Sequence, residues 1–209
     1  MKDTKWIVAT GLDGSGKTTL VEALEGYYTS LGKTVKRSRL PFDRYIVKEL
    51  LDKSTSKYTD RMLFALDNRL FAEEYEEWFT SDDYDVIITQ RGFLDSFVHG
   101  AVQGFGYDFI ADLNRIDELP KCDVMIHMVA EAETAYARIK DDPDADKFEY
   151  LSYIRRQEQE TRRAYRELVN KEPSLEHFHS AQNIYVDTTQ MTTEETFEYV
   201  LKKLKELGF

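Results

Sequence analysis

The apolar residues of this chain fall into short continuous runs, which alternate with longer segments in which apolar positions recur at helical spacing. The clearest runs predict buried strands at Trp6–Ala9, Tyr84–Thr89 and Cys122–Val129, and weaker runs predict strands at 33–36 and 183–186. Helical spacing predicts helices at about 17–31, 45–52, 60–79, from about 94 onward, and at 131–140, 148–170 and 192–207. Strands that alternate with helices predict a three-layer α/β/α protein with a mostly parallel, five-stranded sheet.

Capping signals mark the ends of two of these helices. Gly32 follows the first helix, and we expect it to end that helix in the left-handed conformation. Thr192 or Thr193 is expected to cap the last helix, with Glu194 and Glu195 favourably placed in its first turn.

No repeat, linker or low-complexity segment interrupts the 209 residues, so we expect a single domain over residues 1–209. An acidic stretch broken by a proline, Asp141–Lys147, is interpreted as a short lid. No apolar run approaches the roughly 20 residues of a membrane helix, and the N-terminus has no signal-peptide pattern. We therefore expect a cytoplasmic protein with no membrane contact, in which the single cysteine, Cys122, is a core residue.

The formal net charge is −11, which repels a polyphosphate backbone and makes long nucleic acid an unfavourable partner. An anionic ligand must therefore meet a local group of basic residues.

One stretch carries a specific chemical signal. Residues Gly11–Thr18 read GLDGSGKT, which is the GxxxxGK(S/T) pattern between a predicted strand and a predicted helix. Such a loop wraps backbone N–H groups around phosphate oxygens, and the positive end of the helix dipole adds to the attraction. We expect Lys17 to reach the β- and γ-phosphates of ATP and the Thr18 hydroxyl to hold Mg²⁺. The remaining loop residues expected to bind ATP are Gly11, Asp13, Gly14, Ser15, Gly16 and Thr19.

Other residues decide between classes of nucleotide-binding protein. Regulatory GTPases need a DxxG switch beyond the phosphate loop and an NKxD motif that reads the base, and neither is present. Larger ATPases usually need a longer chain and an acidic residue that ends a strand. Arg39 and Arg91 instead follow predicted strands, and Arg138 and Lys147 border the lid. Several cations around one crevice suit phosphoryl transfer between two anions, which indicates a small-molecule kinase.

Several motifs together resemble the thymidylate kinase family. The phosphate loop matches that family's GxDGxGKTT, and Arg39 with Pro41 resembles its REP loop. Leu63–Asp67 is similar to the LLFAAD helix, Arg91 and Ser96 to the DRY-x-x-S stretch, and Asp146–Glu149 to the DRFE of the lid. The resemblance implies a P-loop kinase fold, a phosphorylated small-molecule acceptor and a homodimer.

The same resemblance implies roles for individual residues. Arg39 is expected to hold the acceptor phosphate, Phe64 to stack on the acceptor base, and Asp13 to contact the acceptor's sugar hydroxyl. Arg138 is expected to pack on adenine, beside a loop that begins at Asp187. Lys17 and Arg91 would stabilise the transferring phosphoryl group and Lys147 would close over it, while Asn68, Arg69, Asp95 and His99 are further candidates for acceptor binding.

The departures from the family pattern concern the acceptor. Gln90 replaces the aspartate of DRY, and Gly92 replaces its tyrosine. Asn68 stands where the family has the arginine that reads the thymine carbonyl, and Arg69 is one position on, turned by about 100° around the helix. Positions that handle phosphate are retained, whereas positions that read the base are not.

Three functions remain open on the sequence alone. The default is a kinase of dTMP or another nucleoside monophosphate. The first alternative is a kinase of the same fold that acts on a non-nucleotide phosphorylated alcohol such as mevalonate 3-phosphate, and the second is a nucleotide-binding regulatory protein without turnover. Asp13, Asp43 and Asp95 are the candidates for a general base if an alcohol is the acceptor.

Overall fold

The computed structural model describes residues 4–42, 44–141, 148 and 150–209. Its strands are β1 (Lys5–Gly11), β2 (Val35–Arg39), β3 (Val86–Gln90), β4 (Val124–Val129) and β5 (Gln182–Asp187). Its α-helices are α1 (Lys17–Ser30), α2 (Arg44–Lys53), α3 (Lys57–Thr80), α4 (Phe93–Val102), α5 (Tyr107–Asn114), α6 (Ala132–Ile139), α7 (Leu151–Val169) and α8 (Thr193–Glu206). Two 3₁₀ helices, η1 (Ile116–Glu118) and η2 (Pro173–Phe178), complete the described elements, and none of these helices is long and apolar enough to cross a membrane.

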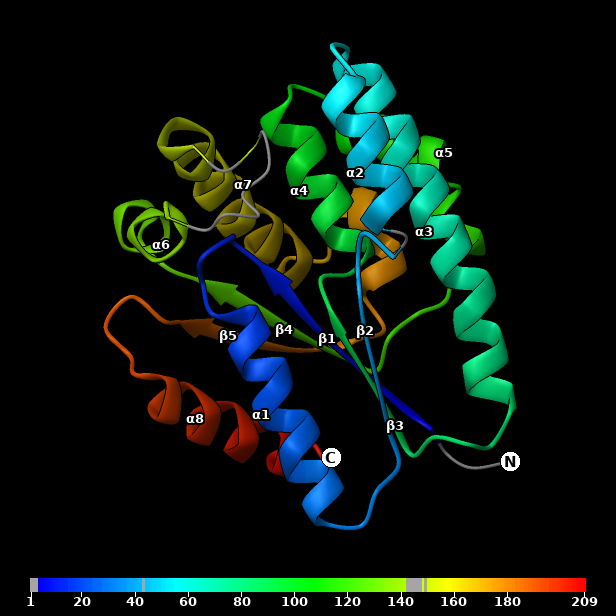
Figure 1. Cartoon of the computed structure of the whole chain (residues 1–209), viewed down its shortest axis with the longest axis vertical. Coiled ribbons are helices and arrows are strands. Elements are labelled where there is room, and N and C mark those ends of the chain that lie inside the picture. Colours follow the sequence, from blue (N-terminus) through cyan, green and yellow to red (C-terminus); the bar gives the residue numbers. More distant parts are fainter. Residues whose placement is uncertain (1–3, 43, 142–147, 149) are drawn as a thin grey trace.

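The five strands form one parallel sheet in the order β2-β3-β1-β4-β5 (Figure 1). The phosphate loop leaves β1, the central strand, with β3 on one side and β4 on the other. β1 comes first in the chain but lies in the middle of the sheet, between β3 and β4. In a parallel sheet, such a reversal of the strand order leaves a crevice beyond the carboxyl ends of the strands. The predicted α/β/α fold with a parallel five-stranded sheet is confirmed.

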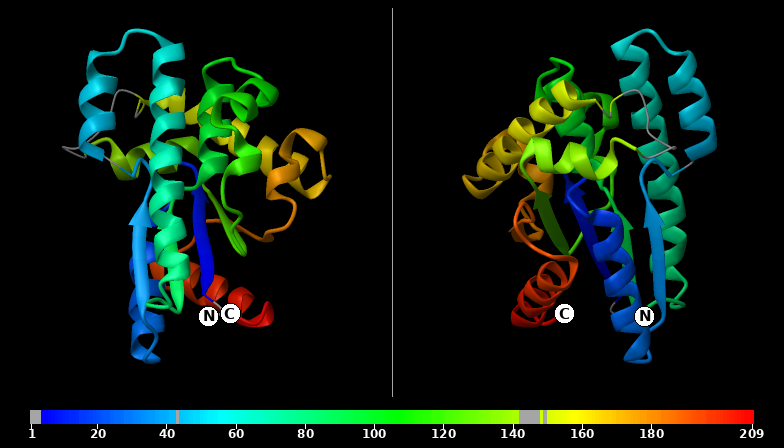
Figure 2. Two further views of the ribbon diagram at one scale, coloured as in Figure 1. Left: turned by 90° about the vertical axis from the view of Figure 1, so that its right-hand side faces the viewer. Right: turned by 60° about the vertical axis from the view of Figure 1, so that its left-hand side comes forward.

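Alternation along β1 separates the two faces of the sheet. Trp6 and Val8 point into a core shared with α3, α4, α5 and α7, whereas Ile7 and Ala9 point into a core shared with α1 and α8. Figure 2 shows these helices as the layers on either side of the sheet. Because both faces of β1 are covered, the strand is apolar at consecutive positions, as the sequence pattern indicates.

Trp6 anchors the larger core. Its ring lies 4.4 Å from that of Tyr75 and 5.7 Å from that of Phe71, both on α3, and 5.9 Å from that of Phe93 on α4. Its indole N–H donates to Thr89 Oγ1 at 3.1 Å, so the buried polar atom is satisfied. This packing fixes α3 and α4 against β1 and β3, and so sets where their side chains stand near the loop.

Several boundaries differ from the sequence expectations. The second strand is Val35–Arg39 and not 33–36, because the Asp85 carboxylate accepts both the N–H and the hydroxyl of Thr34, at 2.8 Å each, and holds Thr34 just before the strand. Cys122 precedes β4 and packs half-buried against the Trp6 core, where burial raises the pKa of its thiol to about 12. α5 and the two 3₁₀ helices were not predicted from the apolar spacing.

The capping expectations at the two helix ends agree with the structure. Gly32 has φ +77°, just beyond the end of α1. Thr192 caps α8: its hydroxyl accepts the N–H of Glu195 at 3.1 Å, while the Glu195 carboxylate accepts the N–H of Thr192 at 2.8 Å. Of the expected lid, Asp141–Lys147, only Asp141 lies among the described residues.

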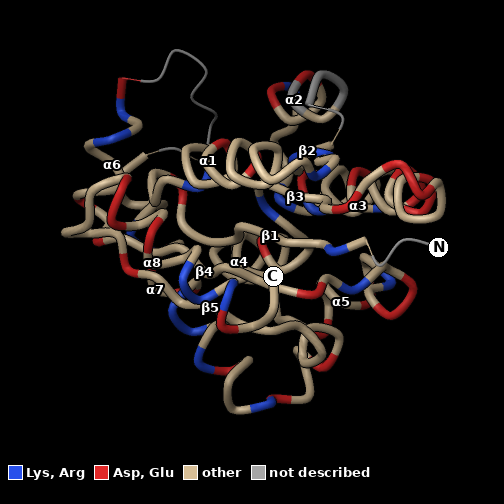
Figure 3. The backbone as a smooth tube through the Cα atoms, turned by 90° about the horizontal axis from the view of Figure 1, so that it is seen from below, with Lys and Arg blue, Asp and Glu red and all other residues tan. Residues whose placement is uncertain are grey.

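Positions of Lys and Arg and positions of Asp and Glu are interspersed along the chain (Figure 3). An acidic group occupies the C-terminal half of α3, where Glu73, Glu74, Glu76 and Glu77 are all exposed. The end of the chain lies against the start of β1, since the Lys5 amine is 5.9 Å from the ring centroid of Phe209. The start of β1 and Phe209 therefore lie at the end of the sheet opposite the carboxyl ends of the strands.

Candidate active site

The turn between β1 and α1 is packed so closely that two of its glycines have no room for a side chain. A Cβ on Gly14, which has φ +79°, would lie 2.2 Å from the carbonyl oxygen of Ala135. A Cβ on Gly11, which has φ +125°, would lie 2.1 Å from the carbonyl oxygen of Met128. Only glycine allows this backbone path, which brings the loop against β4 and α6.

The rest of the loop has the donors that an oxygen-rich anion requires. Ser15 is 1% exposed, and its hydroxyl has no hydrogen-bond partner among the residues that the structure describes. Gly16 caps α1, and Thr18 and Thr19 are exposed in the first turn of that helix. A buried unsatisfied hydroxyl beside a helix N-terminus suits phosphate oxygens, and the exposed Thr18 hydroxyl is accessible to a hydrated cation. The residues present therefore fit a magnesium nucleotide.

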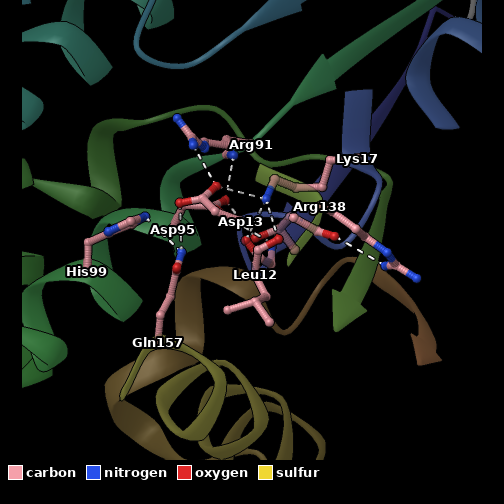
Figure 4. A network of polar contacts seen from close by, with 12 residues as sticks. Leu12, Asp13, Lys17, Arg91, Asp95, His99, Arg138 and Gln157 are labelled. Carbon is pink, nitrogen blue, oxygen red and sulfur yellow. Dashed lines mark hydrogen bonds and ion pairs between the residues drawn. The ribbon is translucent and has the colours of Figure 1, made fainter. Parts of the chain in front are cut away.

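Asp13 stands between two cations (Figure 4). Its Oδ1 accepts from Arg91 Nη2 at 2.6 Å and from Lys17 Nζ at 3.2 Å. Lys17 Nζ also donates to the carbonyl oxygens of Gly11 and Leu12, at 2.8 Å each. Asp13 is 6% and Lys17 4% exposed, so this cluster of charges is largely removed from water.

The charges in this cluster determine one another's ionisation. Burial alone would raise the pKa of the Asp13 carboxyl, but the charges of Arg91 and Lys17 outweigh it and hold that pKa well below its usual 3.8. Burial lowers the pKa of the Lys17 amine, and the charge of Asp13 opposes this shift. Asp13 is therefore ionised at neutral pH and is a weak proton acceptor.

The backbone after β3 carries Arg91 to this cluster. Arg91 has φ +67°, and its N–H donates to the carbonyl oxygen of Ala9 at 2.8 Å. A left-handed conformation is uncommon for such a residue and is typical of functional sites. A Cβ on the following Gly92 would lie 2.6 Å from Cγ1 of Val8, so this backbone has no room for the tyrosine of the family pattern.

Arg39 lies at the same edge of the sheet. It is the last residue of β2 and is in register with Gln90, the residue before Arg91, so the two arginines occupy the ends of adjacent strands. The sequence placed Arg39 in the loop beyond the strand; the strand is longer, and its end reaches the same edge. Asp67 of α3 fixes the chain that follows, because its Oδ2 accepts the N–H of Phe42 at 2.6 Å.

Asp95 joins three segments at this edge. Its Oδ2 accepts from the Thr10 hydroxyl at 2.6 Å and from the N–H of Gly92 at 2.8 Å, and its Oδ1 accepts from the N–H of Gly11 at 3.2 Å. Burial raises the pKa of the carboxyl, and the charge of Lys17 and the bond from Thr10 oppose the rise. These contacts give Asp95 a structural role, and its expected contact with the acceptor stays a prediction.

His99 and Gln157 extend the cluster toward α7. The Gln157 side-chain nitrogen donates to Asp13 Oδ2 at 3.2 Å and lies 3.2 Å from His99 Nε2. Because a carboxylate only accepts, the nitrogen is the donor, and His99 Nε2 is the acceptor. The ring proton is then on Nδ1, which lies 2.9 Å from the Tyr153 hydroxyl. Burial lowers the pKa of His99 to about 3, so the ring is neutral at pH 7.

Arg138 connects the phosphate loop to the turn after β5. Its Nη1 donates to the carbonyl oxygen of Gly14 at 3.2 Å, and its Nη2 donates to that of Thr188 at 2.9 Å. The Thr188 hydroxyl in turn donates to the carbonyl oxygen of Ser15 at 3.0 Å. Arg138, Thr188 and Ser15 line an open hollow of about 390 Å³ beside the loop, which has the size and position of a site for the nucleoside part of ATP.

Asp187 does not line that hollow. Its carboxylate accepts from Arg162 Nη2 at 2.9 Å and from the Thr189 hydroxyl at 2.5 Å. These contacts hold the start of the turn that carries Thr188, so Asp187 acts on the hollow only through the position of that turn.

The three acceptor candidates on α3 stand in different surroundings. The guanidinium of Arg61 covers the half-buried ring of Phe64 at 4.6 Å. Asn68 is 3% exposed, and its amide donates to Ser96 Oγ at 2.9 Å and to Asn114 Oδ1 at 2.7 Å. Arg69 Nη2 donates to the carbonyl oxygen of Asn114 at 3.4 Å and lies 3.3 Å from Glu118 Oε2.

The structure thus gathers Asp13, Lys17, Arg91, Asp95 and His99 around one point and leaves Asn68 and Arg69 in contacts between helices. Lys147 and Asp43 lie outside the described residues. The sequence analysis missed Thr10, Gln157 and Tyr153. Gln157 gave one usable signal, because it is a polar residue on the otherwise buried face of α7, between Ile154 and Thr161.

Comparisons with known proteins agree with this geometry. The family model described as thymidylate kinase matches residues 10–191. A probable thymidylate kinase of Methanococcus aeolicus is 29% identical over 204 residues, covering 97% of this chain and 96% of the relative. A thymidylate kinase of Caldicellulosiruptor saccharolyticus is 28% identical over 216 residues, with 97% of each chain covered.

The fold has a counterpart among solved structures. The thymidylate kinase of Candida albicans superposes with a TM-score of 0.69 and 19% sequence identity, covering 98% of this chain and 92% of that one. The family match spans most of the chain. It includes the whole phosphate loop and leaves out most of β1, the strand that leads into the loop. On these grounds, the chain belongs to the thymidylate kinase family, a family of phosphotransferases.

Proposed function

We propose that this protein transfers the γ-phosphoryl group of ATP to dTMP, with Mg²⁺ as the metal cofactor. The observation that carries the proposal is the cluster in which Asp13 holds Lys17 and Arg91 side by side at the phosphate loop. Two cations in fixed positions can neutralise charge as a phosphoryl group moves between two anions. The names of the relatives in this family support dTMP as the acceptor.

Each part of the reaction has its group of residues. The loop from Gly11 to Thr19 would cradle the phosphates of ATP, with Thr18 as the protein ligand of Mg²⁺. Arg138 and the Thr188 turn would hold the adenosine, and Arg39 would bind the phosphate of dTMP. When bound, Mg²⁺ would act as a Lewis acid and reduce the negative charge on the phosphates. Lys17 and Arg91 would stabilise the transferring group, and Lys147 of the lid would add a third cation.

Asp13 positions the two cations and is available to the acceptor's sugar hydroxyl. It is not proposed as a general base, because its pKa is held well below the usual value and a phosphate acceptor is already anionic.

The proposed assembly is a homodimer of single-domain subunits. We propose one catalytic domain with a lid at about 141–147, acting as a cytoplasmic homodimer. Three exposed apolar side chains on α3, Tyr58, Met62 and Leu66, are spaced by four residues and form a stripe suited to a second helix.

The two alternatives are less well supported. Mevalonate 3-phosphate as acceptor rests on the altered base-reading positions alone, and no residue of the described site selects it. A regulatory protein without turnover would not need Asp13 to hold Lys17 and Arg91 side by side, so the intact cluster favours an enzyme.

The experiment is to measure ADP release from Mg·ATP with dTMP, the other nucleoside monophosphates and mevalonate 3-phosphate. We expect turnover with dTMP, and we expect Lys17→Ala and Arg39→Ala each to lower kcat/KM at least about a hundredfold. Lys33→Ala, at an exposed position before β2, is the control and should leave turnover unchanged. Turnover with mevalonate 3-phosphate alone would overturn the nucleotide acceptor, and ATP binding without any acceptor-dependent ADP release would overturn the enzyme.

A further inference from the structure

Arg61, on the second turn of α3, is a buried cation whose contacts leave part of its guanidinium unused. The residue is 2% exposed. Its Nη1 lies 3.4 Å from the carbonyl oxygen of Ser96, and its guanidinium lies 4.6 Å from the ring centroid of Phe64. Nε and Nη2 have no hydrogen-bond partner among the described residues.

Such an arrangement is unfavourable in the absence of a ligand. A buried charge costs free energy unless it is paired and hydrogen-bonded, and a guanidinium can only donate. Burial lowers the pKa of Arg61 to about 10, and the nearby Tyr153 and Asp60 oppose the shift, so the side chain is still charged at neutral pH. A charged side chain with unused donors in a buried position indicates a binding partner that brings hydrogen-bond acceptors.

The position of Arg61 connects it with the reaction centre. Its charge helps to lower the pKa of His99, the ring that Gln157 joins to Asp13. Phe148 lies 6.5 Å from the ring of Phe64 and 6.4 Å from that of His99, so these aromatic rings form one wall. The guanidinium of Arg61 covers the Phe64 ring of this wall, and Arg61 is not among the residues that line the hollow beside Arg138.

Arg61 lies on the face of α3 that also carries Phe64 and Asn68, the residues expected at the acceptor's base. Arg61, Phe64 and Asn68 are related by three and seven positions, so they share one face of the helix. The Asn68 amide is engaged by Ser96 and Asn114, and Arg69 points toward Glu118. Of the three polar side chains, Arg61 alone combines burial with unused donors.

We propose that Arg61 determines acceptor specificity by donating hydrogen bonds to a carbonyl oxygen of the acceptor's base. The assignment rests on the proposed function, in which the acceptor is a nucleoside monophosphate. A donor-only group selects a base with a carbonyl over one with an amino group at the same place, so it favours dTMP and dUMP over dCMP.

The test compares acceptor kinetics for wild type, Arg61→Met and Arg61→Lys with dTMP, dUMP and dCMP at saturating Mg·ATP. We expect Arg61→Met to raise the KM for dTMP about tenfold to a hundredfold and to reduce the preference for dUMP over dCMP to a similar degree. The KM for ATP should stay as in wild type. Arg61→Lys keeps the charge but loses the planar pair of donors, so it should restore part of the affinity and little of the discrimination.

Two further measurements separate this role from a purely structural one. Replacing an unpaired buried charge by an apolar side chain of similar length should leave the melting temperature of the ligand-free protein unchanged or raise it, whereas loss of a structural residue would lower it. Arg163→Met is the matched control, because Arg163 is half exposed on α7 and pairs with Glu160 and Glu167. It should alter neither the KM for dTMP nor the dUMP preference.

Each outcome bears on a different claim. If wild type turns over dTMP and Arg61→Met keeps both the wild-type KM and the preference for dUMP, the assignment of Arg61 is wrong. It is equally wrong if Arg69→Met produces the loss instead. If wild type turns over no nucleoside monophosphate, the proposed function falls, and the role of Arg61 in reading a base falls with it.

Discussion

At the scale of single residues, Asp13 is the group on which the geometry of the site depends. Its two carboxylate oxygens accept from Lys17, Arg91 and Gln157, which belong to three different elements. Like charges separated by a few ångströms repel strongly when they are buried, so Lys17 and Arg91 can share this space only with an anion between them. The carboxylate therefore acts by placing cations and not by accepting a proton.

Asp13→Asn should weaken both activity and stability. The amide leaves two buried cations without their common counter-charge, so we expect the free energy of unfolding to fall by about 3 kcal/mol and kcat/KM to fall at least about a hundredfold. Denaturant unfolding and ADP release measure the two effects. Asp83→Asn, at an exposed position, is the control. An unchanged unfolding free energy would mean that the Asp13 contacts contribute nothing net to the fold.

The sequence predicts the residues of this cluster unevenly. Lys17 and Asp13 follow from the loop motif, and Arg91 follows from its place after a strand. Gln157 contacts Asp13 across 144 positions of the chain, so no local pattern announces it. The role of Asn68 was equally inaccessible, because its partner Asn114 lies on a helix that the apolar spacing did not reveal.

At the scale of elements, the phosphate loop is held by its neighbours from two directions. Met128 of β4 accepts the N–H of Leu12 at 3.0 Å, and Ala135 of α6 lies directly behind Gly14. The loop therefore has a preformed shape that depends on β4 and α6 as well as on its own glycines.

Gly14→Ala should disturb this shape. The new Cβ would stand 2.2 Å from the Ala135 carbonyl oxygen at φ +79°, so the loop or α6 must move. We expect the Kd for Mg·ATP to rise about tenfold or more and the free energy of unfolding to fall by about 1–3 kcal/mol. Isothermal calorimetry with Mg·ATP and thermal unfolding test both.

Gly26→Ala is the matched control for that substitution. Gly26 lies inside α1, and a Cβ there has nothing within 4 Å, so alanine should stabilise the protein by about 0.5–1 kcal/mol without changing ATP binding. A Gly14→Ala protein that behaves like Gly26→Ala would show that the close approach at Gly14 is not required.

The strands and long helices were predictable because the fold buries the same apolar residues that form the pattern in the sequence. β1, β3 and β4 are buried on both sides and read as continuous apolar runs. β2 is an edge strand with half-buried and exposed residues, so its pattern is weak, and the contacts between Asp85 and Thr34 decide where it begins. Such a long-range contact cannot be read from local sequence.

At the scale of the whole molecule, buried histidines make the fold sensitive to acid. Burial lowers the pKa of His127, which lies 2.7 Å from Asn183 Oδ1, to about 4, and that of His177 to about 4. Below the unfolded value of 6.5, the unfolded chain takes up protons that the folded chain does not. Folding is then opposed by up to about 1.4 kcal/mol per pH unit for each such histidine.

The free energy of unfolding should therefore fall as the pH is lowered from 6.5 toward 4. Denaturant unfolding at a series of pH values measures this slope, and His127→Gln should flatten it while keeping a donor for Asn183. The difference between the two proteins isolates His127 from the carboxylates that titrate in the same range. Parallel pH profiles for the two proteins would contradict the assignment.

Whole-molecule architecture followed from the order of the elements, since strands alternating with helices have few arrangements other than a parallel sheet between helical layers. Which base the acceptor carries did not follow, because Arg61 is marked only by its unused donors and by its burial, and both depend on the packing of α3 against α4.

The bonds of Asp95 to Thr10, Gly11 and Gly92 have a consequence for how such a protein can evolve. They tie β1, the phosphate loop and the start of α4 to one another without help from α3. In the proposed function α3 reads the acceptor's base, so mutations that exchange polar residues along α3 would alter the accepted base while the parts that move phosphate keep their places. Substrate range is accordingly the trait most open to drift among descendants of this chain, and phosphoryl transfer is the trait most resistant to it.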